Sequence, residues 1–332
     1  MKKAIVTGGL GFLGSHLVDK LLERNIEVII IDNEVTSTVD KNFWGDKCNV
    51  FIKSIEEVDL NSKEFENTDM VFHLASIVGP VGVLKHAGDI GKNILGDNLK
   101  LRDFCIKNNS MLVDVSTSEV YGHGEALKEE SQKVFRGDYK VRTEYGAAKM
   151  VAEMSLINKS IMEPKLKYHI IRPFNITGPR QRPDGGFVLP RFVIAALTGQ
   201  PITVYGDGSA VRSFTDVRDI CDGILRVVDD SEPNEMWNVG NPNNKMTILE
   251  LAKLVNKLTE EICSKSSDIT FVNPTLIHGD YFSEPVDKVP YIEKIKGRLG
   301  WQANIKIENI IRDTIEYYDN KIKKENYEFS VI

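Results

Sequence analysis

Residues 3–14 read KAIVTGGLGFLG, and this stretch decides the fold. An apolar run at residues 3–7 leads into three glycines spaced three apart, Gly8, Gly11 and Gly14, and an amphipathic segment follows. This order predicts a strand, a tight turn and the start of a helix. Gly8 and Gly11 let the backbone approach a bound group without Cβ clashes, and Gly14 lets the helix pack close to the sheet.

A second apolar run, at residues 28–31, ends in Asp32 and completes a dinucleotide-binding pattern. The N–H groups of the first helical turn and the helix dipole favour the charge of a pyrophosphate. The carboxylate of Asp32 can accept hydrogen bonds from both hydroxyls of a ribose and would repel a 2′-phosphate, so the sequence predicts NAD rather than NADP. A glycine-rich turn without a ligand is the alternative. The strand before, the helix after and the acid one strand later favour the dinucleotide.

Length and composition place the chain among ordinary globular proteins. Its 332 residues, with 42% hydrophobic and 27% charged, suffice for one large or two modest domains. The formal net charge of −6 argues against nonspecific nucleic-acid binding. The four cysteines are far apart and form no CxxC pair, which predicts reduced thiols in the cytoplasm. No apolar stretch is long enough to cross a membrane, and the first strand begins too early for a signal peptide.

Strand and helix patterns alternate through the first half of the chain. Strands are predicted at 3–7, 27–32, 49–53, 69–73, 111–116 and 168–172, with helices near 12–24, 92–108 and 143–162. The alternation predicts an α/β fold, a Rossmann-like doubly wound parallel sheet with right-handed crossovers. Ligands of such sheets bind beyond the carboxyl ends of the strands. The glycine turn, Asp32, Ala75 and Thr117 are therefore expected at one edge.

The pattern changes after Pro173 and predicts a smaller mixed α/β domain. Helices are expected at 187–198, 247–260 and near 307–322, and a strand at 202–205. Thr247 and Glu250 form the capping box of the second of these helices. The strand at 235–239 is expected to return to the main sheet. We therefore divide the chain into a dinucleotide-binding domain, 1–174 with a returning segment near 215–240, and a substrate domain, 175–214 and 241–325.

A tyrosine and a lysine in YGAAK, at residues 145–149, are candidate catalytic groups. Tyr145 and Lys149 lie four apart and so share one helix face. An ammonium beside a phenol favours the phenolate, which a tyrosine with an ordinary pKa of about 10 needs in order to act as a base near neutral pH. A Tyr/Lys pair on a helix surface is the alternative. Ser116, Thr117 and Ser118 follow an apolar strand, where a hydroxyl can hold a substrate hydroxyl against the tyrosine or cap a helix.

Several longer motifs, taken together, carry a family resemblance. From residue 3 to about 318, the chain resembles an extended short-chain dehydrogenase/reductase of the nucleotide-sugar epimerase/dehydratase group. Besides the glycine turn and YGAAK, the motifs are HLAS at 73–76, STSEVYG at 116–122, RPFNITGPR at 172–180, VYGDGSAVRSFTDVRD at 204–219, NVGNP at 238–242 and LGW at 299–301.

The resemblance implies that bound NAD oxidises the C4 hydroxyl of a UDP-, GDP- or dTDP-linked sugar. Tyr145 would be the base, Lys149 its partner and a contact of the nicotinamide ribose, and Thr117 would position the hydroxyl, with Ser118 and Glu119 also catalytic. Further cofactor contacts would be Phe12, Leu13, Asn33, Ile55, Leu74, Ala75, Ser76, Asn93, Ser116 and Pro173. Substrate contacts would be Arg142, Asn175, Arg180, Val188, Arg191, Tyr205 and Arg212. The resemblance also implies a homodimer formed by the helices near 92–108 and 143–162.

The net reaction after C4 oxidation has several possible outcomes: epimerisation, dehydration, decarboxylation or release of the ketone. Ser118 stands where the 4,6-dehydratases have an aspartate, which argues against dehydration. Thr117-Ser118-Glu119 and Arg142 resemble the UDP-glucuronate decarboxylases, whereas the run DKVP at 287–290 replaces their Arg-Lys-Pro and weakens the expected carboxylate pocket. UDP-glucuronate decarboxylation is the first prediction. A 4-epimerase or 4-dehydrogenase of hexose or heptose substrates is one alternative, and a non-catalytic NAD-binding sensor is another.

Two histidines and two arginines can also be explained without a role in binding or catalysis. His73 ends an apolar strand and is predicted to be a core residue, and no His, Cys and carboxylate cluster has the spacing of a metal site. His123 is either solvated or a substrate contact. Arg180 and Arg182 are either surface charges or anion contacts in a Gly/Pro loop.

Overall fold

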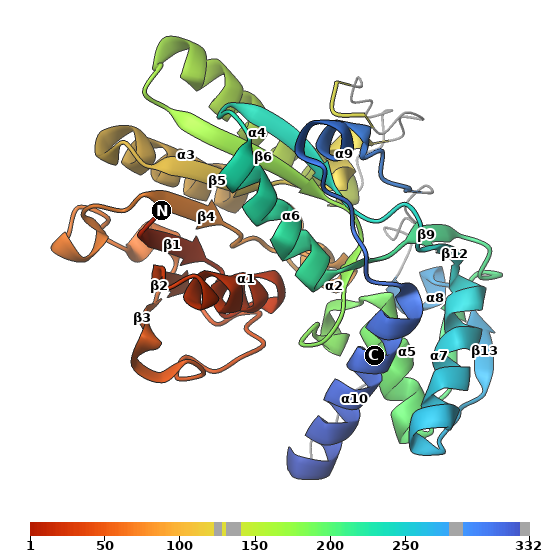
Figure 1. Cartoon of the computed structure of the whole chain (residues 1–332). Helices are drawn as coiled ribbons and strands as arrows, with labels where there is room; N and C mark the ends of the chain where they lie inside the picture. Colours follow the sequence, from red (N-terminus) through yellow and green to blue (C-terminus); the bar gives the residue numbers. More distant parts are fainter. Residues whose placement is uncertain (123–127, 131–140, 279–287, 326–332) are drawn as a thin grey trace.

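The computed structural model describes residues 1–122, 128–130, 141–278 and 288–325. Its centre is a seven-stranded sheet in the order β11-β6-β5-β4-β1-β2-β3 (Figure 1). Every neighbouring pair in this sheet runs parallel, which confirms the predicted doubly wound fold. The strands are β1 (Lys3–Thr7), β2 (Glu27–Asp32), β3 (Cys48–Ile52), β4 (Met70–His73), β5 (Met111–Val115), β6 (Lys167–Pro173) and β11 (Glu235–Val239).

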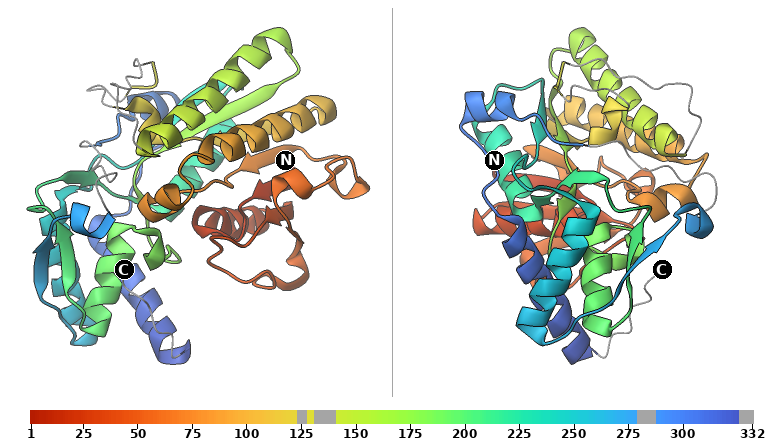
Figure 2. Two further views of the ribbon diagram at one scale, coloured as in Figure 1. Left: turned by 180° about the vertical axis from the view of Figure 1, so that it is seen from behind. Right: turned by 90° about the vertical axis from the view of Figure 1, so that its right-hand side faces the viewer.

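Helices cover both faces of the sheet, which explains why its inner strands are continuous apolar runs. On one face lie α1 (Phe12–Glu23) and α6 (Val217–Asp230), and on the other lie α3 (Ile90–Asn108) and α4 (Val141–Met162) (Figures 1 and 2). The strand order reverses between β1 and β4, and this reversal opens a crevice at their carboxyl ends. The glycine turn after β1 and residues 74–76 after β4 line that crevice.

A second group of helices packs around its own apolar core beside the sheet (Figure 2). It consists of α5 (Val188–Thr198), α7 (Ile248–Cys263) and α10 (Ile307–Glu325), with β8 (Ile202–Tyr205) paired in parallel to β13 (Ile269–Val272). The predicted capping box of α7 is present, since Thr247 and Glu250 satisfy each other's backbone N–H groups. The sequence patterns gave no sign of β13, of α2 (Pro80–Lys85) or of the two-residue pairing of β7 (Ile176–Thr177) with β10 (Thr215–Asp216).

One segment packs differently from the division made on sequence. Helix α9 (Glu293–Leu299) and Trp301 belong to the apolar core under the main sheet, together with α6, although they fall within the range 241–325. The side chain of Arg226 on α6 donates to the carbonyl of Leu299 at 2.9 Å. Residues after 241 therefore contribute both to the apolar core under the main sheet and to the core of the second helix group. The remaining domain boundaries stay a prediction. Among the described residues, no helix has the length and apolarity needed to cross a membrane.

The glycine turn is tightly packed against itself. A Cβ on Gly14 would lie 2.0 Å from the carbonyl oxygen of Gly8 and 2.7 Å from the Cα of Gly9. Gly14 therefore lets α1 pack against the turn, whereas the sequence argument placed this close approach against the sheet. Gly8 has φ of 70°, and a Cβ there would lie 2.9 Å from the backbone nitrogen of Ala75. The turn fits only glycine at both positions.

We predict that Gly14→Ala destabilises the protein by about 1–3 kcal/mol, because backbone atoms of the turn must move to admit the methyl group. Urea unfolding measures this change. Gly96→Ala on α3 is the matched control, since nothing lies within 4 Å of its added Cβ. It should stabilise the helix by about 1 kcal/mol. Equal stability of Gly14→Ala and the wild type would contradict the packing described for the turn.

Candidate active site

The start of α1 has the features of an anion site. Its N-cap residue is Gly11, no side chain of the described residues hydrogen bonds to this end, and the first turn carries no acidic residue. The unpaired N–H groups and the positive end of the helix dipole are therefore left for a negatively charged ligand. Together with the glycine-only turn before it, this end of α1 fits the pyrophosphate of a dinucleotide.

Asp32 is positioned by the protein at the end of β2. Its carboxylate accepts hydrogen bonds from the backbone N–H groups of Leu10 at 3.0 Å and Glu34 at 2.8 Å, and from the hydroxyl of Ser37 at 3.0 Å. An ionised carboxylate offers about four acceptor positions, so one remains for a ribose hydroxyl, and the Ser37 hydroxyl can give way to a second. Asp32 is only 8% exposed and is fixed in this orientation.

The other predicted cofactor residues differ in their exposure and in whether their polar groups already have hydrogen-bond partners. Ser76 follows β4 with Leu74 and Ala75, and its buried hydroxyl has no hydrogen-bond partner among the described residues, as expected for a group that meets a ligand. Ser116 is already engaged, since its hydroxyl donates to Glu153 at 2.6 Å. The remaining residues of this set are exposed Asn33 and Asn93, buried Ile55, and Phe12, Leu13 and Pro173, which are partly buried.

Thr117 and Tyr145 come together at the carboxyl end of β5. The hydroxyl of Thr117 caps the short helix η4 (Ser118–Tyr121) by accepting from the N–H of Glu119 at 3.2 Å, and it also hydrogen bonds to the phenol of Tyr145. The capping role and the catalytic role were alternatives in the sequence, and the structure combines them in one side chain. Tyr145 is 8% exposed and belongs to α4.

Lys149 does not turn its ammonium to the tyrosine in this structure. It donates to the carbonyl of Val115 at 2.9 Å and is 2% exposed. Burial raises the pKa of Tyr145, and the hydrogen bond with Thr117 lowers it only in part. The sequence argument expected a phenolate favoured by the lysine. That expectation is wrong in this structure, because burial, Glu119 and Asp114 all disfavour the phenolate and outweigh the opposing effects of Thr117 and Arg142.

Glu119 lies at the centre of a cluster of cations. Its carboxylate contacts Arg142 at 2.8 Å (Nε) and Lys288 at 2.8 Å (Nζ), and Arg212 is paired to Lys288 through a backbone bridge. Burial acts to raise the pKa of Glu119, but Lys288 and Arg142 outweigh it and lower the pKa to about 2. Burial also lowers the pKa of Lys288 to about 8, although Glu119 opposes this change.

Two cations from distant parts of the chain meet at Glu119. Residues 287–290 carry fewer cations than the decarboxylase run, but the fold brings Lys288 to the Glu119 carboxylate beside Arg142. The backbone of Arg212 forms a bridge with that of Lys288, and the charge of Arg212 acts on Lys288. The expectation of a weakened carboxylate pocket stays a prediction.

Two more predicted substrate contacts, Arg191 on α5 and Tyr205 at the end of β8, lie together. The guanidinium of Arg191 hydrogen bonds to the Tyr205 hydroxyl, donates to the carbonyl of Thr203 at 3.0 Å and lies 4.3 Å from the centre of the Tyr205 ring. Val188 begins the same helix. Asn175, with φ of 37°, donates to the carbonyl of Ser213 at 3.1 Å.

Arg180 lies apart from these residues. It pairs with Asp19 of α1 at 2.8 Å and stacks 4.9 Å from the centre of the Phe43 ring. Arg182 pairs with Asp184 and donates to the carbonyl of Ser37. Both arginines therefore hold their loop against the cofactor-binding layer. One N–H group of Arg180 is engaged by Asp19 and its guanidinium faces the Phe43 ring, and a contact of Arg180 with substrate stays a prediction.

His73 is a core residue, as predicted: it is 1% exposed and its Nδ1 lies 2.9 Å from the Thr7 hydroxyl. Across the described residues, no group of three or more His, Cys, Asp and Glu side chains is arranged to hold a metal ion. His123 lies outside the described residues. Sequence reasoning missed Asp114, a carboxylate inside the apolar run of β5, and Glu153, which pairs with Arg172 in the core. The acidic residue within the apolar run of β5 was a signal that could have indicated Asp114.

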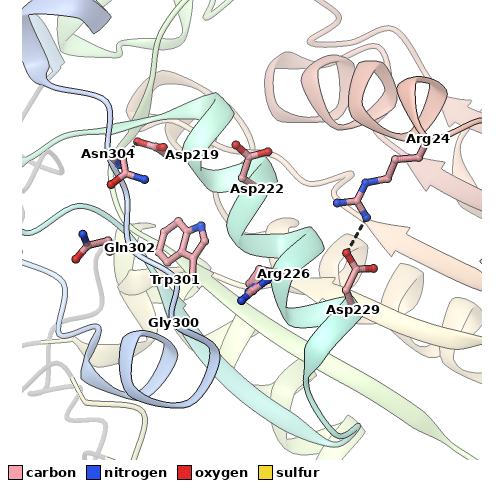
Figure 3. A pocket seen from close by; sticks show the side chains of 9 residues that line it. All are labelled: Arg24, Asp219, Asp222, Arg226, Asp229, Gly300, Trp301, Gln302 and Asn304. Carbon is pink, nitrogen blue, oxygen red and sulfur yellow. Dashed lines mark hydrogen bonds and ion pairs between the residues drawn. The ribbon is translucent and has the colours of Figure 1, made fainter.

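A polar pocket between α6 and residues 300–304 contains none of these residues (Figure 3). Arg24 and Asp229 pair across it at 2.8 Å, and Asp222 pairs with Lys20. Asp219 accepts from the backbone nitrogen of Asn304 at 3.1 Å. Its acids and bases satisfy one another or the backbone, so we place the functional site at the carboxyl edge of the sheet instead.

Comparison with known proteins identifies the family. The model of the NAD dependent epimerase/dehydratase family matches residues 4–240. The chain belongs to this family. Its cofactor is therefore NAD, as the glycine turn and Asp32 predict.

Among similar proteins is UDP-N-acetyl-alpha-D-glucosaminuronate decarboxylase of Bacillus cytotoxicus, 31% identical over 96% of this chain and 98% of that protein. UDP-glucuronic acid decarboxylase 2 of Arabidopsis thaliana is 33% identical over 92% of this chain, which spans 65% of that protein. The structure of Thermus thermophilus UDP-glucose 4-epimerase in complex with NAD is 25% identical, with a TM-score of 0.81 over 95% of this chain and 98% of that one.

We predict that the protein binds NAD about tenfold or more tightly than NADP, which corresponds to about 1.4 kcal/mol. The 2′-phosphate of NADP would meet the Asp32 carboxylate. Asp32→Asn removes the charge and should reduce the ratio of the affinity for NAD to that for NADP, as measured by titration calorimetry. Asp40→Asn, an exposed carboxylate in the loop that follows, should leave the ratio unchanged. Equal affinity of the wild type for both dinucleotides would contradict the role given to Asp32.

Proposed function

We propose that this protein is an NAD-dependent nucleotide-sugar decarboxylase that converts a UDP-linked uronic acid, UDP-glucuronate or its 2-acetamido counterpart, into a UDP-linked pentose and CO₂. The observation that carries this proposal is the contact of Arg142 and Lys288 with Glu119, next to Tyr145 and Thr117. A sugar carboxylate would find complementary charge there. The resemblance to two decarboxylases of UDP-linked uronic acids supports the same substrate class.

The residues at the glycine turn, Asp32, Ser76 and Lys149 would hold the cofactor. When bound, NAD supplies a hydride acceptor that can return the hydride later in the cycle. Because burial raises the pKa of Tyr145, it is the ionised fraction of Tyr145 that takes the proton of the sugar C4 hydroxyl, and the Thr117 hydroxyl orients that group. A carbonyl at C4 makes the C5 carboxylate a β-keto acid, so the C–C bond breaks with its electron pair moving towards the carbonyl oxygen. The hydroxyls of Tyr145 and Thr117 are placed to stabilise the resulting negative charge, and a water molecule from solvent would then supply the proton that C5 needs in the UDP-pentose.

Glu119 and Lys288 would have different roles in this scheme. With a pKa near 2, Glu119 stays ionised at neutral pH and so cannot serve as a proton donor. The ammonium of Lys288, with a pKa near 8, keeps its proton at neutral pH and can pair with a second carboxylate. We therefore assign Lys288 and Arg142 to binding of the sugar carboxylate, with Glu119 as the counter-ion that keeps them in place before substrate arrives.

Epimerisation at C4 is the second candidate. It uses the same first proton transfer at Tyr145, and the similar fold of a UDP-glucose 4-epimerase supports it. A non-catalytic NAD sensor is disfavoured because Tyr145 is held against Thr117 at the sheet edge, where a substrate hydroxyl would lie. The positive charge around Glu119 favours the acidic sugar over a neutral hexose.

We further propose that the enzyme works in the cytoplasm as a homodimer built on α3 and α4. All four cysteines are free. Apolar side chains of α4 are exposed, including Val151 at 45%, Met154 at 50% and Ile161 at 72%. Burial of such side chains against a second copy would remove them from water.

Incubation with UDP-glucuronate and NAD should release CO₂ and a UDP-pentose, detected by mass spectrometry. Tyr145→Phe should lose about 10²–10⁴-fold in turnover, since the proton acceptor is gone, yet bind NAD as the wild type does. The UDP-linked 2-acetamido uronic acid is tested in parallel. Interconversion of UDP-glucose and UDP-galactose without CO₂ from either acid would replace the proposal by the epimerase. NAD binding without turnover of any nucleotide sugar would favour the sensor.

Replacement of Lys288 should weaken binding of the acidic sugar selectively. We expect Lys288→Met to raise the dissociation constant for UDP-glucuronate about ten- to a hundredfold, the value of a hydrogen bond to a charged group, with a smaller effect on UDP-glucose. Lys288→Arg keeps the charge and should retain most of the affinity. In the wild type the preference for the acid should decline as pH rises through about 8, because Lys288 then loses its proton. Calorimetry in the Tyr145→Phe background measures binding alone, and a preference that is unaffected by both changes would refute the assignment.

A further inference from the structure

A buried carboxylate on β5 lies close to the catalytic pair. Asp114 is the fourth residue of β5 and is 1% exposed. Its Oδ1 accepts from the side-chain amide of Asn98 at 3.1 Å, and its Oδ2 has no hydrogen-bond partner within the described part of the chain. A buried carboxylate is costly unless a nearby positive charge compensates for it.

The groups around Asp114 leave one cation for that role. His73 of β4 lies 4.0 Å from Oδ1, but burial lowers its pKa to about 3, so it is neutral. Lys149 of α4 lies against the carbonyl of Val115, the next residue of β5, and interacts electrostatically with Asp114. Like Asp114, Lys149 is almost fully buried.

Other acids near Lys149 are either engaged or on the periphery. Glu153 of α4 forms a two-point ion pair with Arg172, at 2.8 and 2.6 Å, and so belongs to that guanidinium. Asp97 approaches from α3, is partly buried and also faces Lys100. Asp114 acts on the charge of Lys149 most strongly, followed by Glu153, which Arg172 already pairs, and then by Asp97.

We propose that Asp114 is a positioning residue whose carboxylate keeps the Lys149 ammonium protonated against the end of β5 and so sets the pH range in which Tyr145 accepts a proton. This inference rests on the proton-transfer roles proposed for Tyr145 and Lys149, and it does not depend on which sugar the enzyme takes.

The charges around Lys149 and Tyr145 predict the direction in which their pKa values change when Asp114 is replaced. Burial lowers the pKa of Lys149, and Asp114 acts against this by favouring the charged amine. The same carboxylate disfavours a negative charge on Tyr145, which also faces Glu119 and Arg142. Removal of one negative charge therefore lowers the pKa of both groups. Both limbs of a pH–rate profile should move to lower pH, whereas a purely structural role would lower the rate and leave the limbs in place.

The test measures Lys149 directly in the protein without cofactor or substrate. The protein is labelled with carbon-13 at the lysine Cε, and NMR follows the chemical shift of the Lys149 Cε over a range of pH, since this readout does not require the amine to be exposed. In Asp114→Asn, which keeps the shape of the side chain, the midpoint should fall by about one pH unit or more. Asp97→Asn should give a smaller shift in the same direction. Asp103→Asn is the matched control on α3, since Asp103 has an exposed carboxylate paired with Arg102. An unchanged midpoint in folded Asp114→Asn overturns the proposal.

A reciprocal variant covers the case in which Asp114→Asn does not fold. Lys149→Met leaves Asp114 buried without its cation, which raises the pKa of that carboxyl further in the folded state. The folded protein then binds more protons than the unfolded chain as pH falls, so its free energy of unfolding should increase from pH 8 to pH 5 relative to the wild type. Parallel pH dependence of the two proteins in urea unfolding refutes the pairing. Because neither readout uses turnover, failure of the decarboxylase proposal remains separate from failure of this one.

Discussion

All seven strands of the central sheet run in the same direction, and the whole site depends on that constraint. Parallel strands place their carboxyl ends on one edge, so the turn after β1, Asp32 after β2, Ser76 after β4 and Thr117 after β5 meet although they are far apart in the chain. Helices must cover both faces of such a sheet. Helix α4 therefore lies where it presents Tyr145 and Lys149 to the same edge.

Burial of charge is the second constraint. The structure meets it by pairing buried acidic side chains with basic ones. Glu153 and Arg172 form a buried pair, and Arg172 also donates to the Tyr121 hydroxyl at 3.1 Å, which connects η4 to β6. Glu119, nearer the surface, forms ion pairs with Arg142 and Lys288. A buried ion pair costs much if one partner is lost, so these pairs fix the positions of η4, α4 and the segment at residue 288 relative to one another.

The candidate reactive groups hold one another in defined positions. Tyr145 shares a hydrogen bond with Thr117, Lys149 donates to a backbone carbonyl, and the cations around Glu119 are already neutralised in part. A substrate or cofactor would exchange partners with groups that are in place, rather than order them from a disordered state. Such preorganisation lowers the entropic cost of binding.

Much of the fold was predictable because local patterns encode it. The strands of the main sheet, the capping box of α7 and the return of β11 to the sheet all agreed with the structure. The family and its cofactor followed from the glycine turn and the motifs after it. Short pairings such as β7 with β10 have no local signal, since two residues show no periodicity. The burial of Lys149 and the raised pKa of Tyr145 were likewise not predictable, because burial is a property of the packed chain.

By itself, the sequence determined the doubly wound sheet, the dinucleotide turn and the candidate base with its lysine, because each is written in residues close together in the chain. Only the tertiary structure decided the contacts of Arg142 and Lys288 with Glu119, the attachment of Arg180 to α1 and the burial of Asp114 near Lys149. Those features depend on the distances between charges carried by separate elements. Electrostatic energy varies with such distances and with burial, neither of which a linear sequence contains.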